Sequence, residues 1–140
     1  MFSKTFAYAL RATTYVASKG KDERKVNLEE LTLSIQLSPH YLGKIMQELV
    51  RKGILNSTKG PGGGFWMDDD KAKLTIYELL TAVDGEQIVN ACIMGKLKCD
   101  SKTPCPMHDE FSKSKSRLFD LMKKTTLKNW SESVDFSDKH

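Results

Sequence analysis

Residues 27–67 read NLEELTLSIQLSPHYLGKIMQELVRKGILNSTKGPGGGFWM and contain the signals for two short helices followed by a two-stranded ribbon. Asn27, with Glu30 three residues later, forms a capping-box pattern that opens the first helix. Ser38 caps the second helix, and Pro39 occupies its first position, where the missing N–H costs nothing. Two capped helices joined by a short turn are typical of a helix-turn-helix.

The second helix carries one continuous apolar stripe. Its members recur at the i, i+3, i+4 and i+7 positions of a buried helix face, and they are Leu42, Ile45, Met46 and Leu49. Gly53 then ends the helix, because glycine adopts a positive φ without a steric penalty. The stripe predicts that this helix packs on a core and leaves its opposite face exposed.

A glycine-rich ribbon follows the two helices. Residues 54–58 and 65–67 are strand-like, and the segment KGPGGG at 59–64 joins them. Such a ribbon beside a helix-turn-helix is a wing, and its glycines permit close backbone approach to another surface. A flexible hairpin without a function is the alternative, and the adjoining capped helices disfavour it.

The chain has 140 residues and a formal net charge of +4, which suits one domain or a small domain with an oligomerising appendage. Residues 1–67 hold 10 lysines and arginines against 5 acidic residues, whereas residues 68–140 hold 12 against 13. The excess basic charge therefore lies with the helix-turn-helix and the wing, as expected for a phosphate-binding face.

No membrane segment is expected, because no stretch approaches the roughly 20 apolar residues of a membrane span. The first residues also lack the apolar region of a signal peptide, so we expect a cytoplasmic protein. In that compartment the three cysteines should be reduced, which favours metal ligation or redox sensing over a disulfide framework.

Three further helices are expected, and the fold class is mainly α. A helix over 4–19 should support the helix-turn-helix, and a second capping box at Thr75 and Glu78 opens a helix over 76–83. An acidic turn at 68–70 lies between the wing and that helix. The predicted organisation is a winged helix-turn-helix DNA-binding domain over 1–84, a cysteine-bearing loop over 85–108, a long dimerisation helix over 109–130 and a frayed tail over 131–140.

The amphipathic pattern over 109–130 predicts a homodimer. Apolar residues recur along one side of this helix, and lysines and an arginine occupy the other side. A long amphipathic helix this far from the core of a small domain needs a partner surface. A two-fold dimer would in turn bind an imperfect palindrome in double-stranded DNA, with half-sites about one or two helical turns apart.

Four residues that can bind a metal lie within one hydrophilic segment: Cys92, Cys99, Cys105 and His108. Three thiolates and an imidazole can bind zinc, although structural zinc sites favour tighter cysteine pairs. Iron–sulfur clusters also take thiolates, tolerate wider spacing and accept histidine on an iron. Free cysteines that act as small buried hydrophobes are the third alternative, and spacing alone leaves all three open.

The chain resembles the Rrf-two family of bacterial winged-helix regulators over residues 1–130. The resemblance is carried by SPHYLGKIMQELVRKGIL at 38–55, KGPGGGFW at 59–66, LTIYELLTAVDG at 74–85 and the three cysteines. It implies a dimeric DNA-binding repressor or activator, and we expect a repressor. IscR-type and NsrR-type members carry an iron–sulfur cluster, whereas CymR-type members lack the three cysteines.

The resemblance also implies a ligand set. Cys92, Cys99 and Cys105 match the cluster cysteines of the family, and His108 matches the fourth ligand that IscR-type members use for a [2Fe–2S] cluster. NsrR-type members instead take a carboxylate from the first helix of the partner, where this chain has Tyr8. One departure is the first cysteine spacing, which is six residues here where five is usual.

The first turns of the second helix and the wing are the expected DNA contacts. Hydroxyl, imidazole and ammonium groups there can reach base edges or phosphates, and Tyr41 has core packing as an alternative role. The candidate residues are Ser38, Pro39, His40, Tyr41, Lys44, Lys59, Gly60, Gly62 and Gly63. An enzyme is not expected, because no nucleophile arrangement is visible and GPGGG lacks the lysine and serine of a phosphate-binding loop.

Overall fold

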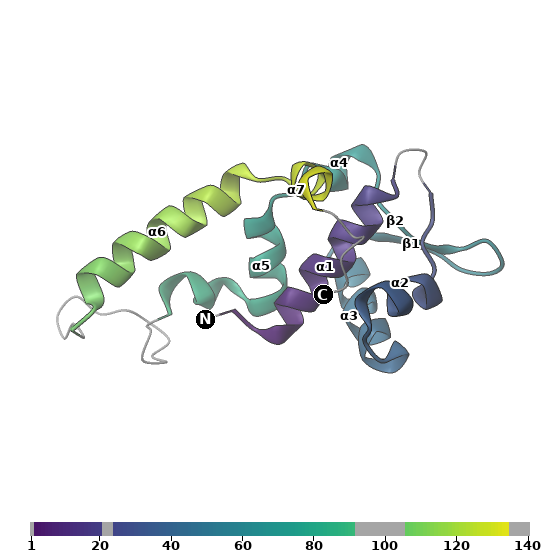
Figure 1. Ribbon diagram of the computed structural model, residues 1–140, viewed down its shortest axis with the longest axis horizontal. Helices are drawn as coiled ribbons and strands as arrows, with labels where there is room; N and C mark the ends of the chain where they lie inside the picture. The colour runs from purple at the N-terminus through teal and green to yellow at the C-terminus, as the bar shows by residue number, and fades with distance from the viewer. Residues whose placement is uncertain (1, 21–23, 92–105, 135–140) are drawn as a thin grey trace.

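The computed structural model describes residues 2–20, 24–91 and 106–134 and shows a mainly helical protein with a two-stranded antiparallel sheet (Figure 1). In chain order the elements are α1 (Lys4–Ser18), α2 (Leu28–Ile35), α3 (Pro39–Arg51), β1 (Asn56–Thr58), β2 (Gly64–Trp66), α4 (Asp69–Ala72), α5 (Ile76–Asp84), the 3-10 helix η1 (Glu86–Asn90), α6 (His108–Lys124) and α7 (Leu127–Ser133). Among the helices of the described ranges, none has the length and apolar character needed to cross a bilayer.

The predicted helix caps are present. The Asn27 side chain accepts a hydrogen bond from the backbone N–H of Glu30 at 2.8 Å, and Ser38 caps α3 in the same way. The reciprocal capping box forms at Thr75 and Glu78. At Asn27 the Glu30 carboxylate does not complete the capping box. It instead accepts hydrogen bonds from Arg24 at 2.8 Å and from the Tyr15 hydroxyl at 2.6 Å.

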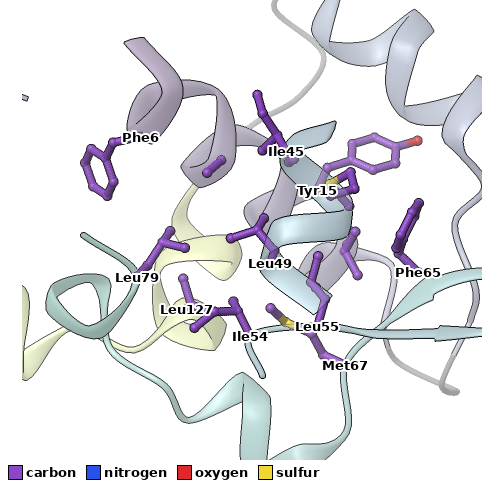
Figure 2. Packing of buried hydrophobic residues seen from close by; sticks show 14 of the residues in the cluster. Phe6, Tyr15, Ile45, Leu49, Ile54, Leu55, Phe65, Met67, Leu79 and Leu127 are labelled. Carbon is purple, nitrogen blue, oxygen red and sulfur yellow. The ribbon is translucent and has the colours of Figure 1, made fainter. Parts of the chain in front are cut away.

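The apolar stripe of α3 forms the centre of the core, as predicted. Its four members are all buried, and Leu42 and Met46 are fully excluded from solvent. Figure 2 shows Ile45 and Leu49 of this stripe facing buried residues of other elements, with Leu79 of α5 and Leu127 of α7 close by. The helix-turn-helix, α5 and the C-terminal helix α7 therefore share one core.

The wing is shorter than predicted and is joined to the chain before α2. Asn56 pairs with Trp66 across the two antiparallel strands, and Val26 adds a bridge to Phe65 through two backbone hydrogen bonds of 2.8 Å. The strand β1 begins at Asn56 rather than at residue 54, because the preceding N–H groups donate to the Leu49 carbonyl at the end of α3.

The stretch expected as one helix over 109–130 is divided into α6 and α7, which corrects the expectation. Thr126 caps α7 by accepting a hydrogen bond from the Asn129 N–H at 3.1 Å. The Thr125 carbonyl accepts the Ile76 N–H at 2.9 Å, and the Leu127 N–H donates to the Leu74 carbonyl at 2.8 Å. These bonds place the break between the two helices against the start of α5, so α7 packs on the domain. The N-terminal part of α6 extends away from the domain (Figure 1), whereas Phe119 and Met122 near its other end are buried in the core.

Two short elements lie where a turn or an irregular loop was expected. Asp68 caps the four-residue helix α4, so the acidic run begins a helix instead of remaining a turn. The helix α5 ends at Asp84 and leads directly into η1, whose last residue, Asn90, precedes the cysteine-bearing segment.

Candidate nucleic-acid interface

The exposed face of α3 lies opposite the buried stripe. Ser38, Pro39, His40 and Lys44 are exposed there, as the sequence predicts for the first turns of a recognition helix. The Ser38 hydroxyl oxygen accepts the Tyr41 N–H at 3.3 Å, so this residue also fixes the helix start. An imidazole and an ammonium group thus project from one exposed helix face, which suits contact with base edges and phosphates.

Gln47 belongs to the same face and was not among the predicted contacts. It is exposed and lies seven positions after His40 and three after Lys44, which places all three on one side of the helix. A glutamine amide can donate and accept simultaneously, and it is suited to the edge of an adenine. Helical spacing from the two predicted residues is the signal that could have identified it.

Tyr41 contacts α1 in the structure. Its hydroxyl lies 3.0 Å from the Thr5 hydroxyl, and its ring meets the Tyr8 ring edge-on with centroids 5.9 Å apart. Its side chain is half-buried by these contacts. The packing role therefore has direct support, and Tyr41 fixes α3 against the supporting helix.

The wing tip presents backbone and one cation. Lys59 is exposed, and Gly60 and Gly62 adopt positive φ angles of 91° and 75° with open space around them. At Gly63 a Cβ atom would lie 2.1 Å from the Thr58 carbonyl oxygen, which no side chain can accommodate. The tip is thus a tight turn that lets another surface approach its backbone closely.

The acidic residue on this side of α3 is neutralised by its neighbour. Glu48 receives two hydrogen bonds from Arg51, at 2.7 and 3.2 Å, and these hold the pKa of the Glu48 carboxyl below its usual range. Because Glu48 is paired with Arg51, Lys44 on α3 and Lys59 in the wing can each contact an anionic partner.

The predicted metal ligands fall mostly outside the described residues. Cys92, Cys99 and Cys105 lie there, whereas His108 begins α6 and is half-buried. Within the described part of the chain, no group of three or more histidine, cysteine or acidic residues could hold a metal ion. The Ala91 carbonyl, at the end of the second described range, accepts a hydrogen bond from the Lys115 ammonium of α6 at 3.2 Å.

A capped helix-turn-helix, a supporting helix and a glycine-tipped wing together define a winged-helix DNA-binding regulator. The chain belongs to the Rrf2 (Rrf-two) family, which is described as a family of iron-dependent transcriptional regulators. The family model matches residues 2–132. Family membership and the winged-helix fold are thereby confirmed.

Two relatives share sequence over most of the chain. An HTH-type transcriptional regulator of Aquifex aeolicus is 31% identical over 142 residues, which cover 100% of this chain and 95% of the relative. The regulator IscR of Vibrio campbellii is 29% identical over 120 residues, which cover 86% of this chain and 70% of the relative.

Solved structures show the same fold. CymR, the global cysteine regulator of B. subtilis, superposes with a TM-score of 0.79 at 17% identity, covering 96% of this chain and 98% of that one. IscR of T. potens superposes with a TM-score of 0.70 at 18% identity, covering 100% and 92%. At these identities the likeness concerns the fold alone.

Proposed function

We propose that this protein is a cytoplasmic, homodimeric transcriptional regulator, acting as a repressor, that binds DNA through α3 and the wing under the control of an iron–sulfur cluster. The observation that carries the DNA-binding part is the exposed stripe of His40, Lys44 and Gln47 on a helix whose opposite face is buried. The stripe begins in the first turn of α3, and the N-terminal residues of a recognition helix are the ones that contact base edges in the major groove.

The wing contributes a second contact. Lys59 pairs with a backbone phosphate, and the glycine turn at Gly60, Gly62 and Gly63 lies against the sugar-phosphate surface, where a side chain would obstruct approach. Phosphate contacts of this kind fix the register of the protein on the duplex, while α3 supplies the sequence preference.

The cluster is proposed from the donor set and from the family. Cys92, Cys99, Cys105 and His108 would hold a [2Fe–2S] cluster, because three thiols and an imidazole are ligands that such clusters take. When bound, the cluster supplies a centre that exchanges electrons and reacts with nitric oxide. The relatives named IscR and the iron-dependent description of the family support this choice.

A regulator with structural zinc or no metal at the cysteines is the second candidate. Zinc takes the same donor set, and the fold is shared with CymR, the global cysteine regulator of B. subtilis. Anaerobic purification discriminates between the two candidates. The proposal expects a brown protein whose visible absorption is lost in Cys→Ala variants, whereas colourless protein with stoichiometric zinc would favour the second candidate.

The dimer is proposed from α6. The N-terminal part of this helix extends away from the rest of the domain (Figure 1). Near its other end Leu121 is 62% exposed, although Phe119 and Met122 beside it are buried in the core. A second copy packed along α6 would cover that surface and place two copies of α3 on one side of the DNA. The target is then an imperfect palindrome.

DNA binding is tested by fluorescence anisotropy with a duplex that covers the region upstream of the protein's own coding sequence. Lys44→Ala and Lys59→Ala should each weaken binding roughly fivefold to tenfold at about 0.1 M salt, because each loses one phosphate contact. The matched control is Lys73→Ala, an exposed lysine that follows α4. Equal affinities and equal salt dependence in all three variants and the parent would show that α3 and the wing do not contact the duplex.

A further inference from the structure

A cavity of about 210 Å³ lies between the start of α1, one side of α3 and the end of α5. The aliphatic side chains that line it are Ile45 and Leu49 of α3, and Ala82 and Val83 of α5. Thr5 and Tyr41, whose hydroxyls are 3.0 Å apart, also line it. The cavity therefore joins the recognition helix to the helix that leads to the cysteine-bearing segment.

Charged groups stand around the cavity on successive turns of α3 and just beyond it. Lys44, Glu48 and Lys52 all line it. The Glu48 carboxylate is engaged by Arg51 at 2.7 Å, so its negative charge is offset. Among the described residues, Lys44 and Lys52 form no ion pair within 4.0 Å, and both are exposed.

Lys52 is held at the cavity by α5. Its ammonium group donates a hydrogen bond to the Ala82 carbonyl near the end of that helix. An ammonium group has three donors, so two remain for another acceptor. The cavity thus combines apolar walls with a positioned cation, which is the composition of a site for a small molecule with an apolar body and an anionic group.

We propose that this cavity binds a small monocarboxylate with an apolar body, of the size of benzoate or hexanoate. A cavity of 150 Å³ in another protein holds benzene, so this one suits roughly eight to ten non-hydrogen atoms. The apolar part lies against Leu49 and Val83, and the carboxylate pairs with the ammonium groups of Lys52 and Lys44. A neutral ligand of the same shape loses this pairing.

Ligand binding should also affect DNA binding, and this consequence rests on the proposed function. Lys44 lies both at the cavity and on the exposed stripe of α3. A carboxylate that engages the Lys44 ammonium competes with a DNA phosphate for the same cation. The two ligands should therefore weaken each other by the same factor.

The direct test is a titration of the ¹⁵N-labelled full chain with benzoate, followed by two-dimensional NMR in the absence of DNA. Benzamide serves as the neutral ligand of the same shape, and sodium chloride matches the ionic strength. Lys52→Gln removes the cation, Ala82→Leu fills the cavity, and Lys73→Gln is the control for the loss of one positive charge.

We expect saturable shifts at the amides of Ile45, Leu49 and Val83, with a dissociation constant on the order of 1 mM for about nine non-hydrogen atoms. Benzamide and the Lys52→Gln variant should each show binding at least fivefold weaker, and Ala82→Leu should abolish it. Absence of saturable shifts, equal binding of benzamide, or unchanged binding in Lys52→Gln would overturn the proposal. Because the titration contains no DNA, its outcome is independent of the proposed function.

The coupling is measured with the anisotropy assay at saturating benzoate, with benzamide at the same concentration as the control. The duplex dissociation constant should rise at least twofold with benzoate and stay unchanged with benzamide. An unchanged dissociation constant with bound benzoate would overturn the coupling.

Discussion

Asp84, the last residue of α5, accepts hydrogen bonds from both the backbone N–H and the hydroxyl of Ser3, the residue that caps α1, with the N–H donor 3.1 Å from the carboxylate. The two residues are 81 positions apart in the sequence. Two residues after Ser3, Thr5 of α1 contacts Tyr41 of α3. The start of α1 therefore connects the end of α5 to α3.

Asp84→Ala should lower the free energy of unfolding by about 1 kcal/mol, because two hydrogen bonds to one exposed carboxylate are lost. For a chain of this length, the expected fall in Tm is about 3 to 5 °C. Thermal unfolding followed by circular dichroism measures it. Asp120→Ala removes an exposed carboxylate from α6 and should leave Tm within error of the parent. Equal losses in the two variants would mean that the contact with Ser3 contributes nothing.

Gly63→Ala should disrupt the wing, because the new Cβ atom would lie 2.1 Å from the Thr58 carbonyl oxygen. The free energy of unfolding should fall by about 1 to 3 kcal/mol, and the affinity for the duplex should fall as well. The matched substitution is Gly43→Ala within α3, where the Cβ atom would sit 3.6 Å from the Leu28 side chain. That variant should gain up to about 1 kcal/mol, since alanine favours a helix over glycine. Urea unfolding of both variants measures these changes. The prediction is wrong if Gly63→Ala is as stable as the parent.

Asp68 gives stability a specific acid dependence. Its carboxylate accepts hydrogen bonds from the Lys71 backbone N–H at 2.9 Å and from the Asn56 amide at 3.1 Å. These bonds lower the pKa of Asp68 below its usual value. Since the folded-state pKa is the lower one, the contribution is present above about pH 4 and is lost as the pH falls through the folded-state pKa.

Asp68→Asn keeps a capping side chain but removes this titration, so stability should fall less steeply with acid than in the parent. The measurement is the urea midpoint at several pH values between about 5 and 2. Asp120→Asn is the control for the removal of one carboxylate. Parallel curves for Asp68→Asn and the parent would contradict the assignment.

Leu121→Arg should convert the proposed dimer to a monomer, because it places a charge at the exposed apolar position of α6. Sedimentation at micromolar concentration measures the change. Leu33→Arg is the matched control, since Leu33 is 75% exposed on α2, away from α6. A parent that sediments as a monomer, or a Leu121→Arg variant that remains a dimer, would exclude the α6 interface.

Local signals were sufficient to predict the helix-turn-helix. The caps at Asn27 and Ser38 bond to N–H groups only three residues away, so the sequence pattern contains both partners. The stripe of α3 is equally local, because burial at i, i+3, i+4 and i+7 follows from helix geometry. Gly53 was correctly placed after α3 and has a φ angle of 78°.

The remaining elements depend on partners that are distant in the sequence. The division between α6 and α7 is held by bonds from residues 125 and 127 to the start of α5, which helical periodicity alone does not reveal. The bridge between Val26 and Phe65 and the hydrogen bond from Lys52 to the Ala82 carbonyl also join residues that are far apart in the sequence. The Thr126 cap was a local signal that could have indicated the start of α7.

Part of the candidate site followed from sequence as well. His40, Lys44 and Lys59 are exposed where the pattern placed them, because their positions oppose the buried stripe or lie at a turn. The packing of Tyr41 against Thr5 depends on a contact with α1, which is distant in the sequence. The sequence therefore predicted this packing only as an alternative to DNA contact. The cluster ligands remain a prediction.

In the proposed function, an iron–sulfur cluster sets the affinity of α3 and the wing for DNA. The deciding experiment is to determine the dissociation constant of the upstream duplex under anaerobic conditions, for the cluster-loaded protein and for the same preparation after iron removal. We expect the two constants to differ at least fivefold, and we expect a Cys92→Ala variant to behave like the iron-free protein. Equal constants for the loaded and iron-free protein would exclude control of DNA binding by the cluster.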